Sequence, residues 1–192
     1  MVKPNTKESM VIGQNRFDFN GTVWNLITKL TENSQDLEWN KALIGDNLEK
    51  NEIRKSQLSW ISSRELKKEL WEIITSYNEI SEWNYDIRGV EDIQYTVYEE
   101  GDHYDWHNDC MSEETSNRKI SASIFLNDPD EYEGGELDIE IRSPKHEVRY
   151  DSFKLPKASI IVFPSNKFHR VRPITSGVRK SLVVWVIGPS FR

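Results

Sequence analysis

Two histidines and one aspartate have the chemistry and the spacing of a metal site. His107 and Asp109 are separated by one residue, and His169 lies 60 residues after Asp109 (169 minus 109). If the first segment is extended, the side chains of residues 107 and 109 point to the same side and can reach one ion. Two imidazoles and one carboxylate leave coordination positions open, an arrangement typical of non-haem Fe(II) oxygenases. A catalytic zinc site can use the same three ligands. The other two histidines, His103 and His146, are predicted to be exposed loop residues.

An arginine and a serine downstream of His169 have the chemistry to hold a second substrate. Arg179 lies ten residues after the histidine, and Ser181 shares its face of an apolar, strand-like segment. The turn formers PITSG would reverse the chain, which places His169 and Arg179 on neighbouring antiparallel strands. A guanidinium binds a carboxylate through two parallel hydrogen bonds, and a buried arginine is costly without such a partner. A dicarboxylate co-substrate would be that partner. The alternative is a surface arginine beside Lys180.

The elements that must position these residues change in character along the chain. Apolar residues at helical spacing predict a helix from about residue 22 and another over about 63–79, with a strand at 53–61. From about residue 91 the period changes to two, and turn formers separate short strand-like segments. These segments are DIQYTVY, KISASIFLN, GELDIEI, SFKLP, ASIIVFP and SLVVWVIG. The pattern predicts an α+β, mainly β fold in which helices pack against a jelly roll of eight strands.

We expect a single domain over residues 1–192. In this interpretation residues 1–90 form a supporting N-terminal part with helices and a strand, and residues 91–192 form the jelly-roll core. A length of 192 residues suits one domain with a sizeable core. The chain is 36% hydrophobic and 30% charged, which is typical of a folded globular protein and not of a disordered one.

Charge and composition argue against several functional classes. The formal net charge is -7 and the isoelectric point is about 5.2, which disfavours nucleic acid as a partner. The single cysteine allows no disulfide within the chain. The N-terminal residues lack the apolar core of a signal peptide, and no segment approaches the roughly 20 apolar residues of a membrane span. These features predict a cytoplasmic protein without a membrane partner.

The motif residues together resemble the prolyl 4-hydroxylase type of the 2-oxoglutarate/Fe(II) dioxygenase superfamily, and its compact bacterial and phage members in particular. The resemblance is carried by Tyr98-x-x-Gly101-x-x-Tyr104-x-x-His107-x-Asp109, His169 and Gly177-x-Arg179, with residues 54–56, 118–127 and 134–136. It extends from about residue 50 to the C-terminus. It implies a double-stranded β-helix with flanking N-terminal helices.

The resemblance also implies a role for each site residue. His107, Asp109 and His169 would bind Fe(II), and Arg179 would pair with the distal carboxylate of 2-oxoglutarate with help from the Tyr98 hydroxyl. O₂ would be the second co-substrate, succinate and CO₂ the products, and ascorbate a candidate reductant. The positions that would line the substrate side of the pocket are Tyr104, Arg118 and Trp185.

The substrate is the least constrained part of this prediction. A peptidyl proline is expected from the resemblance, but collagen-type enzymes often carry lysine at the position of Arg179 and threonine at that of Leu137. A free amino acid or another small molecule is therefore an alternative substrate. Further alternatives are a non-catalytic metal-binding jelly-roll module and a zinc hydrolase on a similar roll. The loops expected to select the substrate are residues 45–51, 82–91 and 111–117.

Overall fold

In three central strands, alternate side chains point into two different buried environments. The strands are β8 (Arg118–Phe125), β12 (Ser159–Pro164) and β15 (Arg179–Ile187). One face carries isoleucine, leucine, valine and alanine side chains that belong to a large apolar cluster. On β8 and β15 the opposite face also carries serines and an arginine, all of them buried. This period-two alternation is expected for strands that separate two different environments, one apolar and one partly polar.

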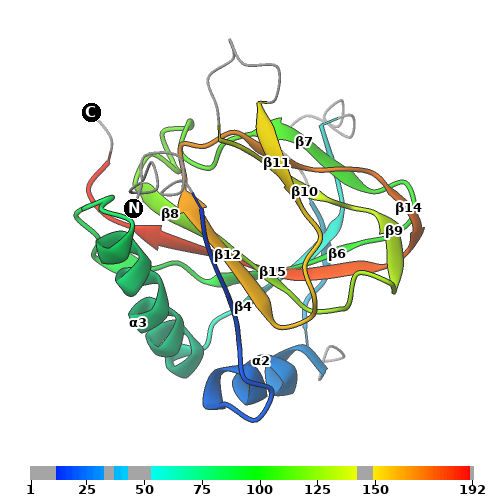
Figure 1. The fold of residues 1–192 in the computed structure, drawn as a ribbon, viewed down its shortest axis with the longest axis horizontal. Helices are drawn as coiled ribbons and strands as arrows, with labels where there is room; N and C mark the ends of the chain where they lie inside the picture. The colour runs from blue at the N-terminus through cyan, green and yellow to red at the C-terminus, as the bar shows by residue number, and fades with distance from the viewer. Residues whose placement is uncertain (1–11, 33–36, 43–52, 142–148, 191–192) are drawn as a thin grey trace, which may run out of the picture.

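These strands form the centre of an eight-stranded major sheet, in a computed structural model that describes residues 12–32, 37–42, 53–141 and 149–190 (Figure 1). The order in the sheet is β1-β12-β8-β15-β6-β4-β2, and β5 pairs with β15. The remaining strands are β1 (Gly13–Arg16), β2 (Asn40–Lys41), β4 (Gln57–Ile61), β5 (Gly89–Val90) and β6 (Ile93–Tyr98). The pairings along this order are antiparallel. The centre of the sheet comes from the C-terminal half of the chain, and the N-terminal strands β1, β2 and β4 lie toward its edges.

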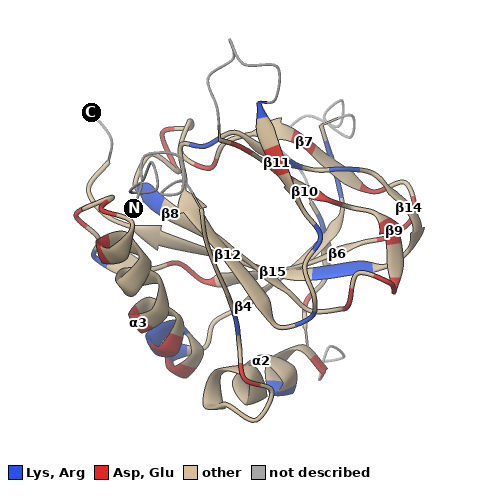
Figure 2. Cartoon of the chain, in the orientation of Figure 1, with Lys and Arg blue, Asp and Glu red and all other residues tan. Residues whose placement is uncertain are grey.

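Two helices, α2 (Thr22–Glu32) and α3 (Arg64–Ile80), cover the outer face of the major sheet (Figure 1). Helix α3 begins after Ser63, whose hydroxyl accepts a hydrogen bond from the backbone N–H of Leu66 at 3.3 Å, as an N-cap residue should. The apolar stripes of both helices are fully or almost fully buried against the sheet: Trp24, Ile27, Leu66, Leu70 and Ile74. Figure 2 shows acidic and basic residues interspersed along α3, as expected for a helix with one solvated face.

A smaller sheet faces the inner side of the major sheet. Its order is β11-β10-β13-β7-β3, and a two-stranded sheet pairs β14 with β9. The strands are β3 (Arg54–Lys55), β7 (His103–His107), β9 (Tyr132–Gly134), β10 (Leu137–Glu140), β11 (Tyr150–Phe153), β13 (His169–Val171) and β14 (Ile174–Gly177). A second apolar cluster joins the sheets, with Phe125, Ile161 and Phe163 from one side and Leu137 and Ile139 from the other.

The architecture confirms the predicted class, a mainly β jelly roll with flanking helices.

A cluster of charged side chains lies on the outer side of the smaller sheet. There Asp138, fully buried, accepts hydrogen bonds from Arg170 Nε at 2.7 Å, Arg172 Nε at 2.9 Å and Ser152 Oγ at 2.6 Å. Within the described ranges, none of the helices has the length and apolar character that crossing a membrane requires.

Candidate metal and co-substrate site

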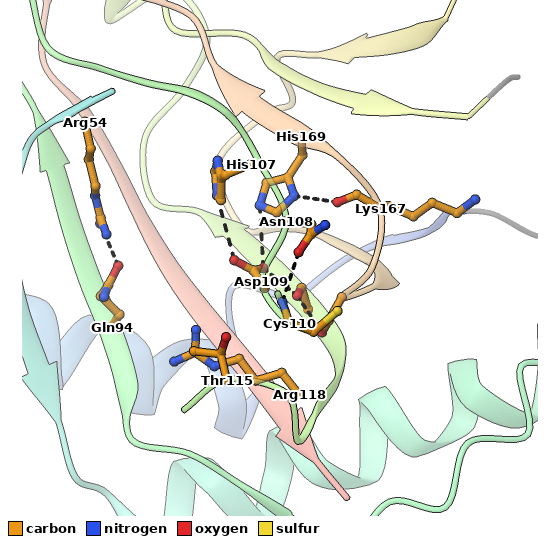
Figure 3. A network of polar contacts seen from close by, with 12 residues as sticks. Arg54, Gln94, His107, Asn108, Asp109, Cys110, Thr115, Arg118, Lys167 and His169 are labelled. Carbon is orange, nitrogen blue, oxygen red and sulfur yellow. Dashed lines mark hydrogen bonds and ion pairs between the residues drawn. The ribbon is translucent and has the colours of Figure 1, made fainter. Parts of the chain in front are cut away.

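The predicted metal ligands meet where two strands of the smaller sheet lie side by side. His107 is the last residue of β7 and His169 is the first of β13, and the two are direct partners in the antiparallel register. Asp109 lies just beyond the end of β7, and its backbone N–H donates to the carbonyl of Ser165 at 2.9 Å. The three side chains point toward one another (Figure 3). The 60-residue separation in sequence is therefore closed by strand pairing.

The donor atoms of these residues are close enough to share one ion. His107 Nε2 lies 3.7 Å from Asp109 Oδ1, and His169 Nε2 lies 3.5 Å from Asp109 Oδ2. All three ligand atoms lie within 4.8 Å of one another. A single ion with bonds of about 2.0–2.2 Å can bridge atoms at the first two separations.

Hydrogen bonds orient both imidazoles for this role. His107 Nδ1 lies 2.7 Å from the carbonyl oxygen of Asp105, and His169 Nδ1 lies 3.0 Å from that of Lys167. A carbonyl oxygen only accepts, so each Nδ1 carries the proton and each Nε2 presents its lone pair toward Asp109. Backbone carbonyls in this position are the usual means by which proteins fix metal-binding histidines.

Electrostatics favours the protonation states that bind metal. Burial, followed by the neighbouring His169, lowers the pKa of His107 to about 3, so this imidazole is neutral at neutral pH. Burial acts to raise the pKa of Asp109, but His169, His107 and the Ser121 hydroxyl together bring it below its ordinary value. The site thus offers a neutral imidazole at His107 and an ionised carboxylate at Asp109, the forms that ligate a divalent ion.

Two further groups hold the ligands in place: Ser121, which the sequence interpretation missed, and Tyr104, which it placed on the substrate side of the pocket. Ser121 Oγ donates to Asp109 Oδ2 at 2.6 Å and lies 2.9 Å from Ser165 Oγ. The ring of Tyr104 stacks on that of His107, with 3.4 Å between centroids and 10° between planes. The signal for Ser121 was present in the sequence, because a serine between Ile120 and Ala122 on an alternating strand must face the opposite side from them.

The predicted co-substrate anchor is buried and incompletely paired. Arg179 is 1% exposed and donates from Nη1 to Ser181 Oγ at 2.9 Å. Its guanidinium carbon lies 5.5 Å from the ring centroid of Tyr98 and 5.4 Å from that of Phe125. No described residue accepts a hydrogen bond from its Nε or Nη2 atoms. These two atoms share one edge of the planar group, the edge that binds a carboxylate side-on. The surface alternative for Arg179 is therefore wrong.

One cavity of about 580 Å³ connects the metal ligands with this anchor. Its volume lies within the usual range for small-molecule sites. The cavity is lined by His107, Asp109, His169, Arg179, Ser181, Tyr98, Tyr104, Arg118 and Trp185, together with other residues. All the site residues predicted from the sequence therefore meet in one place. Their residue types fit a divalent iron at the His/Asp/His cluster and a carboxylate at the free arginine edge.

The residues expected on the substrate side lie on the wall of the same cavity. Arg118 forms a two-pronged ion pair with Glu91, at 2.7–3.2 Å, and its guanidinium carbon lies 3.8 Å above the Trp185 ring. Arg54 lies 4.6 Å above the Tyr104 ring. Sequence reasoning missed Glu91 as the partner of Arg118, because 27 residues separate them and only the sheet brings them together.

The loop residues expected from the sequence differ in how they are placed in the structure. His103 is not an exposed loop residue: it is the first residue of β7 and is half-buried, because β7 pairs with β3 there. His146 and the predicted loop 45–51 lie outside the described residues. Residues 82–91 include strand β5 and Glu91, and the 111–117 loop contributes Glu114 to the cavity wall.

The sequence model of the 2OG-Fe(II) oxygenase superfamily matches residues 93–187, which include the metal cluster and the arginine anchor. The matched residues, 93–187, belong to this superfamily. A PKHD-type hydroxylase of a Synechococcus species is 40% identical over 100 residues, covering 52% of this chain and 43% of the relative. A PKHD-type hydroxylase of Xylella fastidiosa is 51% identical over 67 residues, covering 35% of this chain and 27% of the relative. The matched part is therefore less than half the length of these relatives.

Solved structures of two prolyl hydroxylases have a similar fold. A prolyl-4-hydroxylase from Pseudomonas putida superposes with a TM-score of 0.69 at 19% identity, covering 93% of both chains. A prolyl hydroxylase from Trichoplax adhaerens, solved with a peptide fragment of hypoxia inducible factor, gives 0.67 at 19% identity, covering 95% of this chain and 86% of that one. The likeness extends over both sheets and the helices, which the family match alone does not cover.

Proposed function

We propose that this protein is an Fe(II)- and 2-oxoglutarate-dependent hydroxylase that releases succinate and CO₂. The observation that carries the proposal is the unpaired edge of Arg179, buried in the same cavity as the His107, Asp109 and His169 cluster. A zinc hydrolase would need the metal cluster but has no use for a buried, unpartnered guanidinium. A dicarboxylic co-substrate explains both features at once.

In this proposal each residue has a defined task. His107, Asp109 and His169 hold the iron, while Tyr98, Arg179 and Ser181 hold the distal carboxylate of 2-oxoglutarate. The bound iron would supply the redox chemistry by which O₂ oxidises the 2-oxo acid and the substrate C–H bond together. One oxygen atom ends in succinate and the other in the new hydroxyl group, so the atoms balance with CO₂ as the third product.

The protein's own contribution is positioning and exclusion of water. The Nδ1 hydrogen bonds and the stacked Tyr104 ring prevent His107 from rotating. Ser121 holds one oxygen of Asp109 and leaves the other free to face the ion. Because the ligands and the anchor are both largely buried, few water molecules can compete for the open positions.

A prolyl residue in a peptide or protein is the proposed substrate. The solved structures of similar fold include prolyl hydroxylases, and one of them was solved with a peptide. The cavity wall next to the metal cluster carries Tyr104, Trp185 and the half-exposed Trp60, whose ring lies 6.1 Å from that of Trp185. Flat aromatic surfaces of this kind suit the apolar pyrrolidine ring of proline. Tyr104, Arg118 and Trp185 would contact this ring and its backbone.

A free amino acid or another small carboxylic acid is the second candidate. Arg54 lines the cavity and directs its hydrogen bonds to neutral groups, Gln94 Oε1 at 2.8 Å and Ser56 Oγ at 3.2 Å (Figure 3). Its positive charge is therefore available to the carboxylate of a small substrate. A peptidyl proline has no such carboxylate close to its ring.

The test is release of succinate by iron-loaded protein with 2-oxoglutarate, O₂ and either prolyl peptides or free amino acids, with ascorbate as reductant. We expect the substrate to gain one oxygen atom, detected by mass spectrometry, in the same amount as succinate is released. Asp109→Ala should abolish both products, and the Zn(II)-loaded protein is the matched inactive control. A non-catalytic binding module would release no succinate with any substrate, and retained turnover in Asp109→Ala would refute the ligand assignment.

A further inference from the structure

A third buried polar atom near the arginine anchor has no partner among the described residues. It is the hydroxyl oxygen of Tyr132, a residue that is 3% exposed. Together with Arg179 Nε and Nη2 it makes three orphaned donors on two neighbouring side chains. Each buried polar group without a hydrogen bond lowers the stability of the fold. Such a cluster is therefore expected where a ligand completes the hydrogen bonding.

Several contacts place Tyr132 directly beside Arg179. An added Cβ atom at Gly135 would lie 3.0 Å from Arg179 Cδ and 3.1 Å from Tyr132 Cε2, so both side chains flank this glycine. Tyr132 opens β9 and pairs with Gly177, two residues before Arg179. The tyrosine thus approaches the anchor from the two-stranded sheet, whereas Tyr98 and Ser181 approach it from the major sheet.

The chemistry of these donors selects the ligand. Arg179 has only donors. Burial raises the pKa of Tyr132, while the charge of Arg179 and a side-chain contact with it act in the opposite direction, so the phenol keeps its proton at neutral pH. In that contact the guanidinium can only donate, so the O–H of Tyr132 stays free to donate to a ligand. Their common partner must be an acceptor with several lone pairs and a negative charge. A carboxylate has about four such positions. Two are taken by the free edge of Arg179, which leaves two for the hydroxyls of Tyr98 and Tyr132, while Ser181 accepts from Arg179 Nη1 and orients it.

We propose that Tyr132 donates its hydroxyl to the distal carboxylate of the co-substrate, as a further binding residue beside Tyr98, Arg179 and Ser181. This inference rests on the proposed function. Tyr132 would then help the protein to distinguish 2-oxoglutarate from 2-oxo acids without a distal carboxylate. An acid with a methyl group in place of that carboxylate would leave the same donors buried and unpaired. Sites that hydrogen-bond a buried polar group reject analogues that lack it.

Binding measurements on one variant test the proposal without using turnover. Tyr132→Phe and the unaltered protein are loaded with Mn(II) without oxygen and titrated calorimetrically with 2-oxoglutarate and with 2-oxopentanoate. The second acid has the same chain, with a methyl group in place of the distal carboxylate. Loss of one hydrogen bond to a charged group predicts about 10- to 100-fold weaker binding of 2-oxoglutarate in the variant. The affinity for 2-oxopentanoate should not change.

The ligand pair makes the test specific. Equal weakening for both acids would show that Tyr132 only supports the local structure, and unchanged affinities would remove it from the site; either result overturns the proposal. Tyr95→Phe, a change to another buried tyrosine that packs against the helices, should leave both affinities unchanged. If the unaltered protein binds Mn(II) but not 2-oxoglutarate, the proposed function itself fails and this inference fails with it.

Discussion

Replacing Arg179 by methionine separates the effect of its buried guanidinium on the stability of the fold from its effect on 2-oxoglutarate binding. Methionine preserves much of the unbranched, apolar stem and removes the charge. In the ligand-free protein the charge is 1% exposed and has one hydrogen bond, to Ser181. A buried charge without a counter-ion lowers stability, so an apolar side chain of similar volume should be neutral or stabilising when no ligand is bound.

The same change should destroy the carboxylate site. Two charge-assisted hydrogen bonds from Nε and Nη2 are lost, and truncating one member of a buried charge pair costs about 2–5 kcal/mol. At 1.4 kcal/mol per factor of ten, the affinity for 2-oxoglutarate should fall by about 30- to 4,000-fold. Stability and affinity are thus expected to change in opposite directions, which is the signature of a residue kept for binding.

The assay is thermal unfolding with and without 2-oxoglutarate, on Mn(II)-loaded protein. For a chain of this size the melting temperature moves by about 2–4 °C for each kcal/mol. We expect Arg179→Met to melt at the same or a higher temperature without ligand, and to lose the ligand-induced rise. Lys180→Met, at the adjacent exposed position, is the matched control and should keep that rise. A large drop in the melting temperature without ligand, together with unchanged 2-oxoglutarate affinity, would refute the reasoning.

Three other predictions follow from the surroundings of the site. Ser121→Ala removes the hydrogen bond to Asp109 and should weaken Mn(II) binding by about 10- to 100-fold in metal titrations, while the fold, followed by circular dichroism, stays intact; unchanged affinity would mean that the carboxylate needs no such support. Asp138→Asn should lower the free energy of unfolding in urea by about 1–3 kcal/mol, because it weakens the buried acceptor of two partly exposed arginines, whereas Ser152→Ala should cost only about 0.5–1.5 kcal/mol; equal losses would contradict this ranking. The pKa of His107 is about 3 in the fold and about 6.5 in an unfolded chain, so the unfolded state binds more protons between these values. Metal-free protein should therefore lose stability as the pH falls from about 6.5 toward 3, in urea titrations across that range, and a flat profile would exclude the low pKa.

The sequence predicted the residue types of the site well because short-range rules govern them. The His107-x-Asp109 spacing indicates two ligands near the end of one strand, and alternation along the last strand places Arg179 and Ser181 on one face. The same alternation from about residue 91 predicted the strands of a jelly roll. The period of a strand can be read without knowing what the strand packs against.

Pairings between distant segments could not be predicted in this way. Glu91 and Arg118 meet because β5 and β8 both lie beside β15, and His103 is half-buried because β3 adds to β7. The residues next to Glu91, Arg118 and His103 in the sequence do not indicate which distant segment each of them contacts. The sequence favoured an exposed loop for His103 because its neighbours are polar, and tertiary pairing overrode that preference.

The sequence by itself determined which chemistry the chain can offer: two imidazoles, a carboxylate, a guanidinium and the strands that carry them. Only the tertiary structure decided which of the buried donors are left without a partner. That property belongs to no single segment, because a hydrogen bond is satisfied or orphaned by everything that surrounds it. Tyr132 comes to the side of Arg179 from a different sheet, and the proposed carboxylate site rests on their unpaired atoms.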